Sequence, residues 1–108
     1  VKGSANFPAG HRASERRRWL LDVFGHERLS SGCGVLDVAG GKGELSFELV
    51  NLNRIPSTVV DPRPMQLSKL EKFMKMGIYH NNEAFRRYIA VGVREAMEAE
   101  AAERPAHL

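Results

Sequence analysis

The distribution of apolar and polar residues along the chain predicts short strands interleaved with helices. Residues 35–39 and 58–60 are short apolar runs bounded by turn-forming residues, and both are typical of buried parallel strands. Helices are predicted over about 12–24, 44–53 and 65–76, where apolar residues recur every three or four positions. This order of elements predicts an α/β domain in which parallel strands are flanked by helices.

The first predicted helix places its large apolar residues on one face and its arginines on another. The arginines are consecutive, from Arg16 to Arg18, and Gly25 is placed to end the helix after its last turn. The face expected to enter the core is formed by Trp19, Leu20, Val23 and Phe24. We interpret the arginines as a solvated helix face, with a basic docking surface for RNA or another anionic partner as the alternative.

The two ends of the chain carry weaker patterns. Residues 1–10 hold glycine and proline without periodicity and predict an irregular N-terminal arm, so that 11–108 is expected to form a single domain. A helix over about 83–103 is favoured, because its second half is rich in Ala and Glu. A strand over 88–93 is the alternative, since apolar residues alternate there.

Length and composition fit one globular domain and exclude several classes of protein. The 108 residues are 43% hydrophobic and 27% charged, with a net charge of +3. No apolar run approaches the ~20 residues of a membrane span, so no membrane partner is expected. Cys33 is the only cysteine, and the four histidines lack metal-ligand spacing, so neither a disulfide nor a metal site is predicted. An intracellular, cytoplasmic location is expected, and the acid-free residues 1–14 leave organelle import open.

Three glycines follow the first predicted strand. Gly40, Gly41 and Gly43 lie between that strand and the next helix, and Asp61 ends the following strand. An order of strand, glycine loop, helix, strand and acid is typical of a βαβ unit that binds a nucleotide-like ligand. Missing Cβ atoms let a ligand approach the backbone, and an ionised carboxylate has the acceptors for two ribose hydroxyls.

Two common glycine motifs fit this loop poorly. A phosphate-binding G-x-x-x-x-G-K-[ST] loop would need glycine at Leu36 and a hydroxyl residue at Gly43. A G-x-G-x-x-G dinucleotide fingerprint would need glycine at Ser46, and it gives no reason for Asp37 inside an apolar strand. An NAD-type dinucleotide-binding domain is therefore kept as the second alternative.

The stretch 37–43, DVAGGKG, resembles the D-x-G-x-G-x-G motif of class I S-adenosylmethionine-dependent methyltransferases, which have a Rossmann-like fold. Asp37 matches the acid, Ala39 replaces the first glycine, and the other two glycines match Gly41 and Gly43. Asp61 matches the ribose-binding acid of that family. The resemblance implies S-adenosylmethionine as cofactor and methyl transfer to an unidentified acceptor, which is RNA, protein or a small molecule. The cofactor-binding residues that it implies are Asp37, Ala39, Gly40, Gly41, Gly43 and Asp61.

This resemblance covers only residues 34–61, and the family's sheet is much larger than the two or three strands predicted here. We therefore expect an incomplete or minimal sheet, completed by a second copy in a homodimer or by a missing C-terminal half, because unpaired strand edges are costly. The resemblance identifies no catalytic residue. A non-catalytic fragment or scaffold is the first alternative function. The purely structural interpretation is a glycine-rich turn capped by Asp37, with Asp61 starting a second turn.

Overall fold

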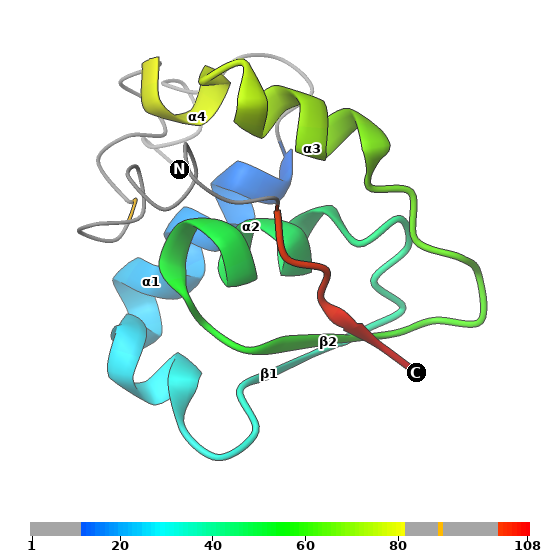
Figure 1. Cartoon of the computed structure of the whole chain (residues 1–108). Coiled ribbons are helices and arrows are strands. Elements are labelled where there is room, and N and C mark those ends of the chain that lie inside the picture. Colours follow the sequence, from blue (N-terminus) through cyan, green and yellow to red (C-terminus); the bar gives the residue numbers. More distant parts are fainter. Residues whose placement is uncertain (1–11, 82–88, 90–101) are drawn as a thin grey trace.

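A small parallel sheet forms the base of the structure (Figure 1). The computed structural model describes residues 12–81, 89 and 102–108. Within them the strands β1 (Val35–Val38), β2 (Ser57–Val60) and β3 (Ala106–His107) lie in the order β1-β2-β3, and both pairings are parallel. The predicted α/β class with parallel strands and a minimal sheet is confirmed.

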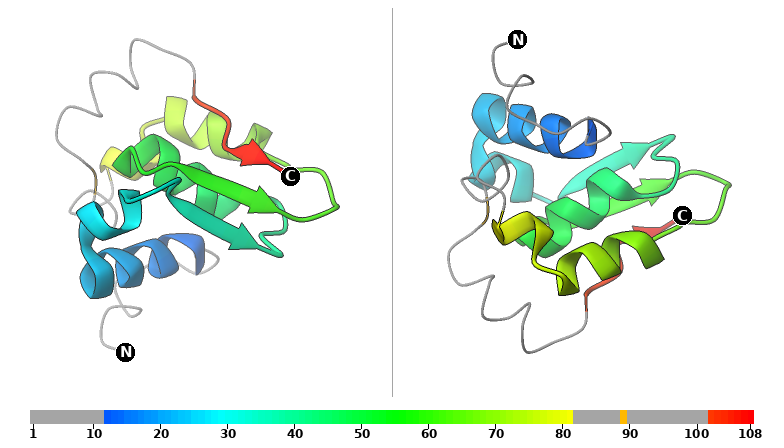
Figure 2. Two further views of the ribbon diagram at one scale, coloured as in Figure 1. Left: turned by 90° about the horizontal axis from the view of Figure 1, so that it is seen from below. Right: turned by 90° about the horizontal axis from the view of Figure 1, so that it is seen from above.

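The described residues form four helices: α1 (Arg12–Ser30), α2 (Glu44–Asn53), α3 (Ser68–Lys75) and α4 (Ile78–Asn81). α2 packs directly on one face of the sheet, and α1 and α3 pack against α2. Figure 2 shows the arrangement from two sides: the strands lie in front of the helices when viewed from below, and behind them when viewed from above. The βαβ unit of β1, α2 and β2 therefore has one covered and one uncovered face.

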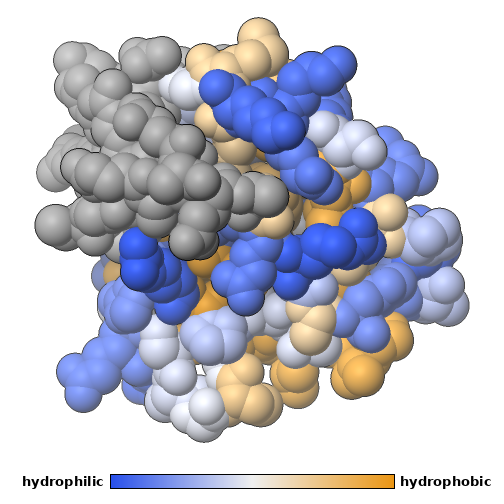
Figure 3. Space-filling model, viewed as in Figure 1, coloured by the Kyte–Doolittle hydropathy of each residue, from blue (hydrophilic) through white to orange (hydrophobic). Residues whose placement is uncertain are grey.

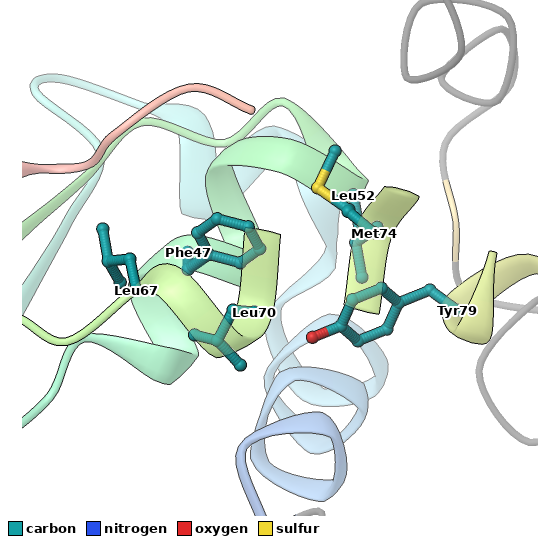
Figure 4. Close-up of a cluster of buried hydrophobic side chains, with 6 residues drawn as sticks. All are labelled: Phe47, Leu52, Leu67, Leu70, Met74 and Tyr79. Carbon is teal, nitrogen blue, oxygen red and sulfur yellow. The ribbon is translucent and has the colours of Figure 1, made fainter. Parts of the chain in front are cut away.

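The hydrophobic core lies between α2 and the segment that carries α3 and α4. Phe47 and Leu52 of α2 face Leu70 and Met74 of α3, and Tyr79 of α4 closes the cluster (Figure 4). The apolar spacing predicted that each of α2 and α3 would have a buried face, and the structure packs these two faces together. The core thus fixes the direction of α2, whose first residue follows the glycine loop.

α1 departs from the prediction, because its buried face is the polar one. Trp19 is 53% exposed, and Val23 and Phe24 are also exposed, whereas Arg17 is only 1% exposed. The Nε of Arg17 donates to Oε1 of Glu48 at 2.9 Å, so a buried ion pair replaces the expected apolar contact between α1 and α2. The interpretation of Arg16 to Arg18 as a solvated face is therefore wrong for Arg17.

Two further groups complete the junction between α1 and α2. Ser14 Oγ lies 2.8 Å from each carboxylate oxygen of Glu48, and Arg17 Nη1 donates to Oδ1 of Asn53 at 2.7 Å. The predicted end of the helix at Gly25 is marked by a kink: Gly25 has a non-helical backbone (φ 78°, ψ 159°), and helix resumes as far as Ser30.

β1 is more exposed than a buried strand would be. Leu36 is 57% and Val38 is 72% exposed, and both point to the face of the sheet away from α2. Figure 3 shows apolar side chains reaching the surface along the lower edge of the molecule, on this side of the sheet. The expectation of a fully buried strand is wrong, because within the described residues no helix covers that face.

The C-terminal residues form a strand that the sequence analysis missed. Most of the predicted 83–103 helix, and the alternative strand over 88–93, lie outside the described residues apart from Ile89. At 102–105 the backbone is not helical, so the helix does not extend to Glu103. Instead, the side-chain amide of Asn51 on α2 both donates to and accepts from the backbone of Glu103, at 2.8 Å each. These two bonds direct the chain into β3, beside β2.

Candidate functional site

The candidate site is the corner where β1 and β2 end, which we call the glycine-loop corner (residues 37–43 and 61–63). The backbone N–H of Ala39 donates to the carbonyl of Val60 at 2.8 Å, so the loop starts where the β1–β2 ladder stops. The loop then turns through Gly40 and Gly41 into Gly43, which precedes α2. In open α/β sheets this edge, at the carboxyl ends of the strands, is where ligands bind.

Asp37 holds the loop from beneath. Its Oδ2 accepts a hydrogen bond from Ser46 Oγ at 2.9 Å, and Ser46 Oγ lies 2.7 Å from Ser57 Oγ. A polar chain of three side chains therefore links β1, α2 and β2 under the loop. This accounts for an acid within an otherwise apolar strand. It also gives Ser46 a role that a glycine at this position could not fill.

The three glycines have different reasons to lack a side chain. A Cβ on Gly40 would lie 2.7 Å from Oδ2 of Asp37, and a Cβ on Gly43 would lie 3.1 Å from Sδ of Met65. At those two positions the space is taken by the protein itself. Among the described residues, a Cβ on Gly41 would find only Nη2 of Arg63 within 4 Å, at 3.9 Å. Gly41 is therefore the loop glycine whose backbone is open to a ligand.

Ala39 has a left-handed backbone, which glycine adopts more readily than alanine. Its φ is 56°, in the left-handed region that costs an L-residue roughly 1–2 kcal/mol. The loop keeps the left-handed turn despite the Cβ. Ala39 is exposed, so this strain comes from the backbone and not from crowding.

Asp61 is the most highly bonded residue of the corner. Its Oδ2 accepts from the backbone N–H of Gly41 at 2.9 Å, which joins the end of β2 to the loop. Its backbone carbonyl accepts from Nε2 of His107 at 2.7 Å, which joins the end of β2 to β3. Asp61 thus bonds to Gly41, and Asp37 lies beside Gly40, so the structure brings the two predicted acids to the same corner.

Arg63 is a site residue that the sequence analysis missed. Its backbone N–H and its Nε donate to Oδ1 of Asp61 at 2.9 and 3.0 Å, and its Nη2 donates to Oδ2 at 2.8 Å. The signal was present in the sequence: an aspartate at a turn commonly binds the backbone N–H two residues later, which would place residue 63 at the carboxylate. The sequence analysis named a turn starting at Asp61 but did not follow it to residue 63.

These bonds control the charge of the site. The guanidinium and backbone N–H of Arg63, followed by the N–H of Gly41, hold the pKa of Asp61 well below its usual range. The carboxylate is therefore ionised at neutral pH and stays so under mildly acidic conditions. The pKa of Arg63 is raised by its hydrogen bond to Asp61, so both members of the pair are charged at neutral pH.

The corner has the parts that an adenosine ligand needs. A bare backbone at Gly41 can lie against the nucleoside, and an ionised carboxylate beside it can accept from two ribose hydroxyls. Both fit S-adenosylmethionine, provided that the guanidinium of Arg63 gives up its place on Asp61. Lys42 of the loop is exposed.

The described part of the chain contains no group of three or more His, Cys, Asp or Glu residues placed to hold a metal ion. Cys33 is a free, exposed thiol in the turn before β1. Of the helices that the structure describes, none combines the length and apolar character needed to cross a bilayer.

Comparison with known proteins adds no family to these observations: no protein-family model, no curated protein and no solved structure matches the chain.

Proposed function

We propose that this chain binds S-adenosylmethionine at the glycine-loop corner, as a methyltransferase-like domain that serves methyl transfer to an acceptor still to be identified. The adenosine lies against Gly41, and the two ribose hydroxyls bind the carboxylate of Asp61. Asp37 acts from beneath by fixing the loop through Ser46. S-adenosylmethionine supplies the activated methyl group, and the residues of the corner bind and orient the cofactor.

The observation that carries this proposal is the joint position of Gly41 and Asp61. A left-handed glycine (φ 63°), with open space in front of its Cα, donates its N–H to an ionised carboxylate at the end of the next strand. Open backbone and ribose acceptor therefore lie side by side. A glycine-rich turn of purely structural use would need the acid bond, but it would not need the open space at Gly41.

The β1–β2 face favours a second candidate function. Leu36 and Val38 are exposed on the uncovered face of the sheet, although both are apolar. A non-catalytic scaffold would use this face to bind a partner protein, as would one part of a larger enzyme. NAD-type dinucleotide binding is less well supported, because the buried hydroxyl of Ser46 bonds to Asp37 where that fingerprint requires glycine.

Calorimetric titration tests the proposal and separates the three candidates. S-adenosylmethionine, S-adenosylhomocysteine and NAD are titrated separately into the same protein. Saturable binding of the first two, with no heat from NAD, is the expected result. Preference for NAD would favour a dinucleotide-binding domain. Absence of binding to all three would favour the scaffold.

A further inference from the structure

The carboxylate of Asp61 has no acceptor position left for a ligand. An ionised carboxylate offers about four acceptor positions, two on each oxygen. Oδ1 accepts from the backbone N–H and the Nε of Arg63, and Oδ2 accepts from Nη2 of Arg63 and the N–H of Gly41. A ribose can bind this carboxylate only if some of these four donors leave.

The four donors differ in how easily they can leave. Two donors are backbone N–H groups, of Arg63 in the turn after β2 and of Gly41 in the glycine loop. Because these groups are part of the main chain of the corner, their loss would require the corner to refold. The other two are Nε and Nη2 of one guanidinium, whose side chain is 71% exposed. Water solvates the released cation well, whereas the carboxylate of Asp61, whose side chain is only 2% exposed, then needs the replacement donors that a ligand brings. The guanidinium is therefore the donor that can be exchanged.

The guanidinium also has the geometry of the group that would replace it. Its Nε and Nη2 donate side by side to the two oxygens of Asp61, at 3.0 and 2.8 Å. Neighbouring 2′- and 3′-hydroxyls of a ribose are likewise two adjacent donors for two carboxylate oxygens. Nη2 is also the atom nearest to the open side of Gly41, at 3.9 Å from an ideal Cβ there. One side chain thus covers both halves of the proposed nucleoside position.

We propose that Arg63 is an internal competitor of the ligand: its guanidinium occupies the ribose position on Asp61, and a nucleoside with a free 2′,3′-diol binds by displacing it. This inference rests on the proposed function and adds a specificity rule to it. A ligand with two free hydroxyls can take both vacated acceptors, whereas a ligand without them cannot. The observed affinity equals the intrinsic affinity multiplied by the fraction of molecules in which Arg63 has left the carboxylate.

Arg63→Ala tests the proposal, with Lys72→Ala as a control that removes one positive charge from the exposed side of α3. Adenosine and 2′,3′-dideoxyadenosine are titrated into the wild-type protein and both variants. Both probes are uncharged, so loss of a cation does not change their long-range attraction. Arg63→Ala is expected to bind adenosine at least about twofold more tightly than wild type, because an ion pair with one buried partner contributes at least as much free energy as a fully exposed pair. Lys72→Ala is expected to match wild type, and dideoxyadenosine to show no gain in any protein.

Salt gives a second readout that needs no substitution. Added salt screens the attraction of the exposed guanidinium of Arg63 for Asp61, and the buried carboxylate limits this screening, so wild-type affinity for adenosine is expected to rise modestly between about 50 and 500 mM NaCl. The affinity of Arg63→Ala is expected to stay level over the same range. A nonspecific effect of salt on nucleoside binding would appear in both proteins.

The outcomes separate this inference from the proposed function. Equal affinities of wild type and Arg63→Ala for adenosine would overturn the inference while leaving nucleoside binding in place. Weaker binding by Arg63→Ala would make Arg63 a ligand contact and would also overturn it. Binding by Arg63→Ala alone would support both the inference and the proposed function. Absence of binding by either protein to adenosine and to S-adenosylhomocysteine would contradict both.

Discussion

The backbone N–H of Gly41 donates a hydrogen bond to Oδ2 of Asp61 at 2.9 Å, across 20 positions of the chain. The bond joins the glycine loop after β1 to the end of β2. It also places the exposed backbone of the loop beside a carboxylate that neighbouring donors keep ionised. The proposed function depends on this pair, and the predictions below test the pair and the structure that supports it.

Gly41→Val is expected to abolish binding of S-adenosylhomocysteine, because the branched side chain would fill the space reserved for the nucleoside. Gly32→Val is a matched control: Gly32 has nearly the same φ, 59° against 63°, and an added Cβ there would also be free of close contacts. Both variants should lose roughly 1–2 kcal/mol of stability from the left-handed backbone. Calorimetric titration should show loss of binding only in Gly41→Val. Near-native affinity in that variant would place the ligand elsewhere.

Ala39→Gly is expected to stabilise the protein by about 1 kcal/mol, because glycine adopts the left-handed conformation without a penalty. The structural basis is the φ of 56° at Ala39, an exposed residue with no core contact to lose. Urea unfolding of both proteins measures the difference. Glycine also raises the conformational entropy of the unfolded chain, which opposes this gain. If Ala39→Gly destabilised the protein, the backbone strain at Ala39 would be smaller than this entropic cost.

Acid stability is expected to depend on Asp61. Hydrogen bonds from Arg63 and Gly41 lower its pKa in the folded protein, so the folded state favours the ionised form more strongly than the unfolded state does. This contribution is complete above the unfolded pKa of about 3.9 and is lost as the pH falls below it, toward the folded pKa. Urea unfolding of wild type and Asp61→Asn over about pH 2–7 should show a constant difference above about pH 5 that narrows in acid. If the difference in unfolding free energy between the two proteins stayed constant down to the lowest pH, Asp61 would not contribute to acid stability in this way.

Removing one partner of the buried pair between α1 and α2 is expected to be severe. Arg17→Leu should lower the free energy of unfolding by about 3–5 kcal/mol, because the Glu48 carboxylate would stay buried without its guanidinium. The double variant Arg17→Leu with Glu48→Leu should recover most of that loss. Arg16→Leu, on the exposed side of α1, should change stability by no more than about 0.5 kcal/mol. Chemical denaturation of wild type and the three variants measures these changes in the free energy of unfolding. A double variant as unstable as Arg17→Leu would contradict this account.

Much of the βαβ unit could be predicted from the sequence, because its signals are local. α2 spans Glu44–Asn53, as the spacing of its apolar residues and the preceding Gly43 predicted. Both ends of β1 and of β2 lie within one residue of the predicted ends of these strands. Each of these elements is encoded by its own residues together with the turn residues that flank it.

Two of the features that were missed depend on contacts between distant residues. The buried face of α1 could not be identified from periodicity, since Arg17 is buried only because Glu48 meets it from another helix. β3 is two residues long and has no strand pattern; its place beside β2 depends on Asn51 binding the backbone of Glu103. In the candidate site the two acids and the loop could be predicted, whereas Arg63 required knowledge of the turn geometry that brings it back onto Asp61.

The central claim is that an adenosine ligand rests on Gly41 with its ribose at Asp61, and amide NMR tests it most directly. S-adenosylhomocysteine is added stepwise to ¹⁵N-labelled protein, and the shift of each assigned backbone amide is followed. The account predicts saturable shifts centred on Gly41, Asp61 and Arg63, with Gly32 and the α1 amides unchanged. Unchanged amides at the glycine-loop corner, or saturable shifts confined to another part of the protein, would contradict it.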